Sequence, residues 1–313
     1  MNSYLIDPMA HKILAFRMTM VFICAAATLG FCSVELQSAD NDVSTFTLWQ
    51  LPSQTPSQNM SYVLRSREGA VVVIDGGNTG DAEYLRGFLA PLGNRVTAWF
   101  VSHPHPDHVD ALTVLLRQPQ GLTIDCIYGS TPDEAWVAEH EPNPPTHLAT
   151  VRNFNQAIHD RGQAFQELSP GQRIEIDGML IEVLGIKNTE IVANAINNSS
   201  IVLRIADDHK SVLFTGDLGV EGGRKLLKSE YGARLSADYV QMAHHGQAGV
   251  DINFYRAVRP RYCLWPTPTW LWDNDSGGGK GSGPWQTISV RQWMDRMNVE
   301  KHYVSADGLI RID

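Results

Sequence analysis

Residues 103–108 read His103-Pro104-His105-Pro106-Asp107-His108 and directly follow the largely apolar run 96–102. Three imidazoles and one carboxylate in such a short stretch offer the nitrogen and oxygen donors that zinc and similar divalent ions prefer. The two prolines restrict the backbone torsion φ, so we expect these donors to project from stiff, extended backbone. The segment therefore predicts a metal site where a buried strand ends.

Two later segments end in the same kinds of donor. Residues 212–217 form an apolar run that ends on Asp217, and residues 242–246 end on His244, His245 and a glycine. A carboxylate at a strand end can bridge two ions that lie about 3.5–4 Å apart, as two-metal hydrolytic sites require. Together the three segments predict a dinuclear centre built from loops at strand ends.

Short β-type runs and helical patterns alternate from residue 45 onward. Strands are expected at 46–51, 60–66, 70–74, 96–102, 124–128, 173–176, 179–184, 201–206, 211–215, 239–243, 262–265, 302–305 and 309–310. Helices are expected at 81–92, 109–116, 146–161, 221–231 and 288–297. Residues 129–147, rich in Pro, Glu and His, are expected to form a long loop or lid. This order predicts a layered α/β sandwich rather than a barrel.

In these elements the chain resembles the metallo-β-lactamase-fold hydrolases, over roughly residues 45–310. The matching motifs are Ile-Asp-Gly-Gly with Asp75, the segment 103–108, Thr-Gly-Asp at 215–217 and His-His-Gly at 244–246. The run Asn-Asn-Ser-Ser-Ile-Val-Leu-Arg at 197–204, followed by Leu-Phe-Thr-Gly-Asp and Ala-Asp-Tyr-Val-Gln-Met-Ala-His-His-Gly, is similar to the hydrolase domain of ComEC-type competence proteins and its stand-alone relatives. The resemblance implies a four-layer αββα sandwich.

The resemblance also implies a role for each donor. The implied metal ligands are His103, His105, Asp107, His108, Asp217 and His245. The first two hold the first ion, Asp107, His108 and His245 hold the second, and Asp217 bridges. Asp107, Asp217 and His244 are the implied catalytic residues, with His244 near the leaving group, while Asp75 supports the histidine loop. The expected cofactors are two divalent ions, zinc by default with manganese or iron as alternatives.

One ligand position departs from the family pattern. Many members carry another histidine between the first motif and Gly-Asp, whereas this chain has Asn-Asn-Ser-Ser at 197–200. Three alternatives stay open: Asn198 coordinates weakly or holds a water, His140 or His147 substitutes from the preceding loop, or the first site is weak and fills only at high metal concentration.

Half of the eight tryptophans cluster near the C-terminus, as Trp265, Trp270, Trp272 and Trp285. They either anchor the C-terminal loop by hydrophobic packing or form an aromatic wall over the metals. The glycine-rich segment 275–283 beside them is expected to be mobile.

The N-terminus has the order of a secretory signal. Lys12 and Arg17 precede the apolar run 18–31, and small or polar residues follow before Asp40. We therefore expect residues 1–39 to be a signal peptide or short membrane anchor and residues 40–313 to be the hydrolase domain, exported to the periplasm or the extracellular space. Cys126 and Cys263 would then remain, as buried thiols or as a disulfide.

The leading interpretation is an exported metal-dependent hydrolase of phosphoester or phosphodiester bonds that uses a metal-bound hydroxide. The alternatives are a lactone, lactam or carboxylic-ester hydrolase of the same fold, or a non-catalytic surface-binding domain. The expected partner is a small-molecule or surface-polymer ester. Nucleic acid is disfavoured, because the net charge of −9 repels polyanions. Membrane contact is expected only through residues 13–32, if they are not cleaved.

Overall fold

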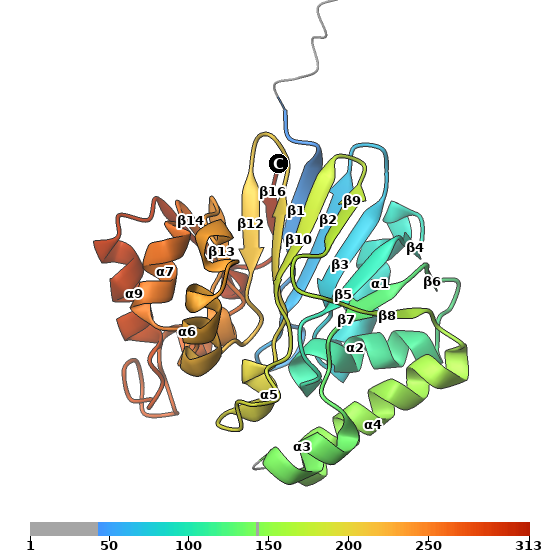
Figure 1. Ribbon diagram of the computed structural model, residues 1–313, viewed down its shortest axis with the longest axis horizontal. Helices are drawn as coiled ribbons and strands as arrows, with labels where there is room; N and C mark the ends of the chain where they lie inside the picture. Colours follow the sequence, from blue (N-terminus) through green and yellow to red (C-terminus); the bar gives the residue numbers. More distant parts are fainter. Residues whose placement is uncertain (1–42, 142–143) are drawn as a thin grey trace, which may run out of the picture. The chain divides into compact units, whose positions relative to one another are not determined.

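The computed structural model describes residues 43–141 and 144–313, so the prediction for residues 1–39 lies outside the described part of the chain. Two large sheets dominate these residues (Figure 1). The first contains, in spatial order, β16 (Ile310–Ile312), β1 (Phe46–Gln50), β2 (Ser61–Ser66), β3 (Val71–Asp75), β5 (Ala98–Val101), β7 (Ile127–Gly129) and β8 (Phe165–Glu167). The second contains β15 (Lys301–Val304), β14 (Tyr262–Trp265), β13 (Tyr239–Gln241), β12 (Ser211–Phe214), β11 (Val202–Ala206), β10 (Met179–Gly185) and β9 (Arg173–Ile176). A small separate ladder joins β4 (Arg95–Val96) to β6 (Thr123–Ile124).

Helices cover the outer face of each sheet. The helices of the described residues are α1 (Ala82–Leu89), α2 (Pro106–Arg117), α3 (Glu134–His140), α4 (Pro144–Arg161), α5 (Ala195–Asn198), α6 (Val220–Lys228), α7 (Ile252–Val258), α8 (Thr269–Trp272) and α9 (Thr287–Arg296). Side chains of α1, α2 and α4 share one apolar cluster with outward residues of the first sheet, such as Trp99. Side chains of α6, α7 and α9 share another with outward residues of the second sheet, such as Trp265. The predicted α/β class and four-layer αββα sandwich are therefore confirmed.

The strands next to the site are buried on both faces. In β3, Val72 and Ile74 belong to the core between the two sheets, while Val71 and Val73 pack against the helices outside. Alternate side chains of a strand point to opposite faces. A strand enclosed between a second sheet and a helical layer therefore reads as a continuous apolar run, as 71–74 does in the sequence.

Each sheet changes from antiparallel to parallel pairing part-way across. β3, β5, β7 and β8 are parallel to one another, and so are β12, β13, β14 and β15. The carboxyl ends of parallel strands meet at one edge of a sheet, and residues that follow such strands come together there. The segments 102–108, 215–217 and 242–246 all follow parallel strands, β5, β12 and β13.

Two sequence predictions about the backbone were wrong. The helix behind the His cluster begins at Pro106 instead of at residue 109, so Asp107 lies in a helical turn and not on extended backbone. Proline suits the first helical position, because its missing N–H would have no partner there. Residues 129–147 are also not one long loop: α3 lies within them, and α4 begins at Pro144. Cys126 and Cys263, the cysteines of the described residues, are both free.

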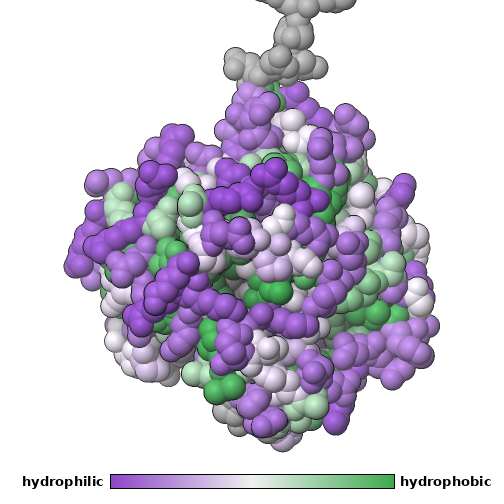
Figure 2. Space-filling view, in the orientation of Figure 1, coloured by the Kyte–Doolittle hydropathy of each residue, from purple (hydrophilic) through white to green (hydrophobic). Residues whose placement is uncertain are grey.

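The face shown in Figure 2 is mainly hydrophilic, with hydrophobic residues in small separate areas. The apolar runs of the strands lie instead in the interior, where Leu48, Val63 and Phe100 are fully buried. Among residues 43–141 and 144–313, no helix is both long enough and apolar enough to cross a bilayer.

One carboxylate joins the two sheets at the end opposite the parallel-strand termini. Asp207, in the turn between β11 and β12, accepts hydrogen bonds through Oδ2 from Ser44 Oγ and Thr45 N, both at 2.6 Å. Its Oδ1 accepts from the backbone N–H groups of His209 and Lys210, both at 2.8 Å. Partial burial opposes ionisation, but these hydrogen bonds outweigh it and lower the pKa of Asp207 to about 2.

We expect Asp207→Asn to lower the free energy of unfolding by about 1 kcal/mol at pH 7, because the variant lacks the ionised carboxylate. The effect is small because the carboxylate is partly exposed and solvent screens its interactions. The folded pKa of about 2 lies below the unfolded value near 3.9, so the carboxylate stabilises the fold fully above pH 4. The difference between wild type and variant should shrink as pH falls toward 2. Denaturant unfolding of both proteins between pH 2 and 6 measures it, and a pH-independent difference would contradict the role given to Asp207.

Candidate metal centre

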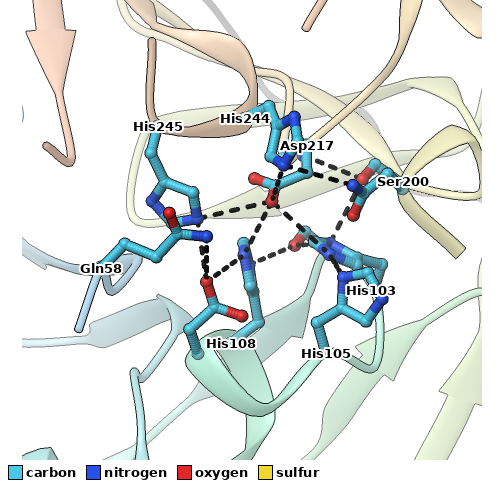
Figure 3. Close-up of polar contacts among 12 residues, drawn as sticks. Gln58, His103, His105, His108, Ser200, Asp217, His244 and His245 are labelled. Carbon is cyan, nitrogen blue, oxygen red and sulfur yellow. Dashed lines mark hydrogen bonds and ion pairs between the residues drawn. The ribbon is translucent and has the colours of Figure 1, made fainter. Parts of the chain in front are cut away.

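The first histidines reach the site from the end of β5. After Ser102 the chain turns through His103, and His105 caps α2 with extended backbone (φ −85°, ψ 156°). Asp107 and His108 then occupy the first turn of α2. Two ring nitrogens face each other here, because His103 Nε2 lies 3.0 Å from His105 Nδ1 (Figure 3).

Asp217 reaches the site from the end of β12 through a tight turn. Gly216 has φ +54°, and a Cβ there would lie 2.7 Å from Ser200 Oγ. The backbone N–H of Asp217 donates to that same hydroxyl at 2.9 Å. Only glycine allows this close approach, so Gly216 fixes where the carboxylate points.

The two histidines after β13 adopt an unusual backbone. His244 and His245 have φ values of +52° and +55°, in the left-handed region. His245 Nδ1 donates to the carbonyl of Pro266 at 2.9 Å, which leaves its Nε2 facing the carboxylates. That Nε2 lies 3.0 Å from Asp107 Oδ2 and 3.4 Å from Asp217 Oδ2.

The structure brings all six predicted metal ligands into two adjoining donor groups. The first group is His103, His105 and Asp217, and the second is Asp107, His108, Asp217 and His245. Within each group the donor atoms lie within 4.8 Å of one another. Asp217 belongs to both groups, and Figure 3 shows its carboxylate between His103 on one side and His108 and His245 on the other.

Buried polar atoms in the centre fit a divalent cation. His105 Nε2 and Asp217 Oδ1 are buried and have no hydrogen-bond partner among the described residues. His108 Nε2 and His245 Nε2 contact carboxylates as ion pairs without a hydrogen bond. Buried polar atoms are normally satisfied, so this set of unsatisfied nitrogen and oxygen donors fits a divalent cation.

Hydroxyl and carboxylate groups behind the histidines fix their orientation. Asp75 accepts from Ser102 N at 2.7 Å, from Ser102 Oγ at 2.6 Å and from His108 Nδ1 at 2.7 Å. His103 Nδ1 lies 3.0 Å from Ser102 Oγ and 3.2 Å from Ser200 Oγ. His103 and His108 therefore use Nδ1 for support and keep Nε2 for the centre, a common arrangement around metal-binding histidines.

The electrostatic environment divides the histidines into two kinds. Burial, aided by neighbouring His108, holds the pKa of His103 well below its usual value, and burial lowers the pKa of His105 to about 4. Burial also disfavours charge on His245, but Asp217 and Asp107 outweigh it and raise its pKa to about 10. Neutral His103 and His105 thus have a free lone pair, whereas an ion near Asp217 would displace a proton from His245.

His244 lies outside both donor groups, at the rim of the centre. Its side chain is 21% exposed, and its Nε2 lies 3.9 Å from Asp217 Oδ2 and 3.4 Å from Asn197 Nδ2. Its Nδ1 donates to the carbonyl of Ala248 at 3.2 Å. Of the two adjacent histidines, His245 is therefore the one placed among the candidate ligands.

Both ends of the Asn198 side-chain amide are engaged by backbone groups. Its Nδ2 donates to the carbonyl of Ala193 at 2.8 Å, and its Oδ1 accepts from the N–H of Gly222 at 2.9 Å. Both ends of the amide thus hold α5 against the start of α6. The neighbouring Asn197 turns toward His244 instead, and its Oδ1 is buried without a hydrogen-bond partner among the described residues.

The two loop histidines named as alternatives have different surroundings. The ring of His140 packs edge-on against Trp136, with centroids 5.2 Å apart. The ring of His147 lies 4.3 Å from that of His105. Only His147 thus reaches the centre.

Gln58 belongs to the centre although nothing in the sequence pointed to it. Its Nε2 donates to Asp107 Oδ2 at 3.0 Å, and its Oε1 accepts from Gln247 Nε2 at 3.2 Å (Figure 3). It lies in a polar loop before β2 that has no repeated pattern. A sequence does not show which polar residue of such a loop contacts the centre. Gln58 is identified as that residue only by its position in the fold.

The C-terminal tryptophans fall into two pairs. Trp265 is fully buried and packs against Trp272, with centroids 5.2 Å apart, so this pair anchors the C-terminal segment. Trp270 packs on Trp285 at 4.8 Å and donates from Nε1 to the carbonyl of Pro56 at 2.8 Å. An aromatic wall could include only this second pair.

Comparison with known proteins agrees with this geometry. Residues 54–124 match the family model described as the metallo-beta-lactamase superfamily. The chain is similar to ComE operon protein 3 of Bacillus subtilis (strain 168), with 26% identity over 181 residues, and the match covers 56% of this chain and 21% of that protein. The chain thus corresponds to only a small part of this relative's length.

Solved structures show the same fold at low sequence identity. The metallo-beta-lactamase fold protein YhfI from Bacillus subtilis is 14% identical, with a TM-score of 0.53, covering 86% of this chain and 100% of that one. Unliganded yeast PDE1 is 10% identical, with a TM-score of 0.50, covering 84% and 97%. The superfamily match of residues 54–124, the shared fold of the described residues and a centre of His and Asp donors able to hold metal all agree, so the chain contains a segment of the metallo-beta-lactamase superfamily within a fold of that type.

Proposed function

We propose that this protein is an exported hydrolase of phosphodiester bonds that works with two divalent metal ions, zinc by default. The observation that carries the proposal is the position of Asp217, whose carboxylate belongs to both donor groups. A carboxylate shared between two groups is what a two-ion hydrolytic centre requires. Export rests on the N-terminal sequence alone.

The residues around the centre would have different roles in hydrolysis. Bound ions would supply Lewis acidity and lower the pKa of a water molecule. Asp107 and Asp217 offer carboxylate oxygens that can orient that water and accept its proton. His244, partly exposed at the rim, can hydrogen-bond the leaving group through Nε2.

Two features favour an anionic ester as substrate. The candidate ions, with His244 and the Asn197 amide at the rim, would stabilise negative charge on phosphoryl oxygens. The order of the Asn-Asn-Ser-Ser, Thr-Gly-Asp and His-His-Gly segments resembles the ComEC-type branch more than the β-lactamases. No nucleophilic residue needs to be invoked, since the activated water can attack directly.

The test is hydrolysis of a chromogenic phosphodiester by the full chain, stripped of metal and then refilled with zinc or manganese. We expect no turnover after stripping and restored turnover on refilling, with a chromogenic carboxylic ester and a lactone measured alongside. Faster hydrolysis of either comparison substrate would favour the carboxylic-ester and lactone alternative. No hydrolysis of any substrate at confirmed metal occupancy would favour the non-catalytic surface-binding alternative.

A further inference from the structure

A third group of donors lies beside the dinuclear centre, where α3 is followed by α4. It consists of His105, Glu141 and His147, and one donor atom of each lies within 4.8 Å of the other two. Glu141 directly follows α3, and His147 lies near the start of α4. The third group shares His105 with the group of His103 and Asp217 but neither of those two residues, so it offers a separate place for an ion.

Hydrogen bonds behind His103 determine which nitrogen of His105 is free. Ser102 Oγ donates its one hydrogen to Asp75 Oδ2 at 2.6 Å, so it accepts from His103 Nδ1 at 3.0 Å. In a neutral ring, a proton on Nδ1 leaves the lone pair on Nε2. His103 Nε2 therefore accepts from His105 Nδ1 at 3.0 Å, and the lone pair of His105 lies on its Nε2.

Two buried ring nitrogens of the third group have no hydrogen-bond partner among residues 43–141 and 144–313. They are His105 Nε2 and His147 Nδ1. His105 is only 9% exposed, and its ring centroid lies 4.3 Å from that of His147. His147 Nδ1 contacts Glu141 Oε1 at 3.1 Å as an ion pair without a hydrogen bond. Buried ring nitrogens are normally satisfied, so this pair beside a carboxylate indicates a missing ligand.

The carboxylate of the third group is buried, and the helices around it are packed together. Glu141 is only 8% exposed, and burying a carboxylate is costly unless it is paired or binds a metal. Val137 of α3, Val151 of α4 and Ile196 of α5 form one apolar cluster. The donors are therefore held near one another before an ion binds.

We propose that His105 Nε2, Glu141 and His147 form a separate divalent-cation site, outside both donor groups of the dinuclear centre. Two imidazoles and one carboxylate suit zinc and also accept manganese or iron(II). The inference goes beyond the proposed function, because a cation can bind here whatever the protein hydrolyses.

The shared ring makes this site compete with the first donor group. A neutral imidazole offers one lone pair. An ion held by His103 and Asp217 needs that lone pair on the Nδ1 of His105, which faces His103, whereas the new site needs it on Nε2. Binding at either place should therefore weaken binding at the other, by the same factor in both directions.

The experiment measures the zinc content and affinity of the full chain by competition with a chromophoric chelator, in a His103→Ala background that disables the first donor group. This chain should still bind one ion through the third group, in addition to the ion of the four-residue group. Adding Glu141→Gln, which keeps the shape of the side chain, or His147→Asn should weaken that one ion by at least about tenfold. Adding His140→Asn is the matched control and should not, because His140 lies in the same connection but outside every donor group.

Melting curves in chelator establish that each variant is folded, and Asp217→Asn serves as the second background if His103→Ala does not fold. Equal zinc binding with and without Glu141→Gln in the folded background would show that no ion uses this site. In the chain that keeps His103, Glu141→Gln should leave the ions of the dinuclear centre bound at least as tightly as in wild type, because a competitor is lost. Weaker binding of those ions would make Glu141 a support for His105, and the inference would be wrong.

Discussion

Replacing Asp217 by asparagine should lower kcat/KM for a phosphodiester by about 10²- to 10³-fold or more, the scale expected when a charged group that acts in the transition state is lost. The substitution keeps the shape of the side chain but removes the charge that both donor groups share. Binding of both ions should therefore weaken together. The dependence of the hydrolysis rate on substrate concentration, at defined free metal, measures the first effect, and metal content after dialysis measures the second.

The control for Asp217 is a carboxylate on the same side of the fold that belongs to neither donor group. Asp110, one turn after Asp107 on α2, meets this condition and contacts Thr79 Oγ1 at 3.4 Å. Asp110→Asn should keep turnover and metal content close to wild type. Undiminished hydrolysis by Asp217→Asn would remove the bridging role from Asp217.

Replacing Gly246 by alanine should lower the free energy of unfolding by about 3 kcal/mol or more, through overpacking in addition to backbone strain. Gly246 has φ +80°, and a Cβ there would lie 2.3 Å from Cε3 of Trp265. Trp265 cannot give way easily, because it is fully buried and its Nε1 donates to His302 Nδ1 at 2.9 Å. The turn that holds His245 would move instead, so metal binding should weaken as well.

Gly277 separates the two causes of this loss. It has φ +103°, but a Cβ there would meet no heavy atom of the described residues within 4 Å. Gly277→Ala therefore carries only the backbone penalty, about 1–2 kcal/mol. Denaturant unfolding of the two variants gives the comparison, and equal losses would mean that the Trp265 contact contributes nothing.

Much of the centre could be predicted from the sequence because its donors follow strand ends. His103, Asp217 and His245 each come directly after a strong apolar run, and parallel pairing brings such ends to one edge. The layered fold was equally readable, since strands buried on both faces appear as uninterrupted apolar segments such as 71–74.

The residues that escaped prediction act through contacts between distant segments. Gln58 contacts Asp107 across the fold, and Ser200 supports both His103 and Asp217, yet neither belongs to a periodic pattern. Asn198 was a ligand candidate by position alone, and its hydrogen bonds to residues 193 and 222 could not be read from the sequence.

The shared carboxylate has a mechanical consequence. His103 and His108 come from the half of the chain that forms the first sheet, whereas Asp217 and His245 come from the half that forms the second. An ion bound by residues from both parts would act as a reversible cross-link between the two sheets. It would have to dissociate before the sheets could separate. Resistance to heat and proteases would then rise with the concentration of free metal. A protein without metal would lose stability together with hydrolytic activity.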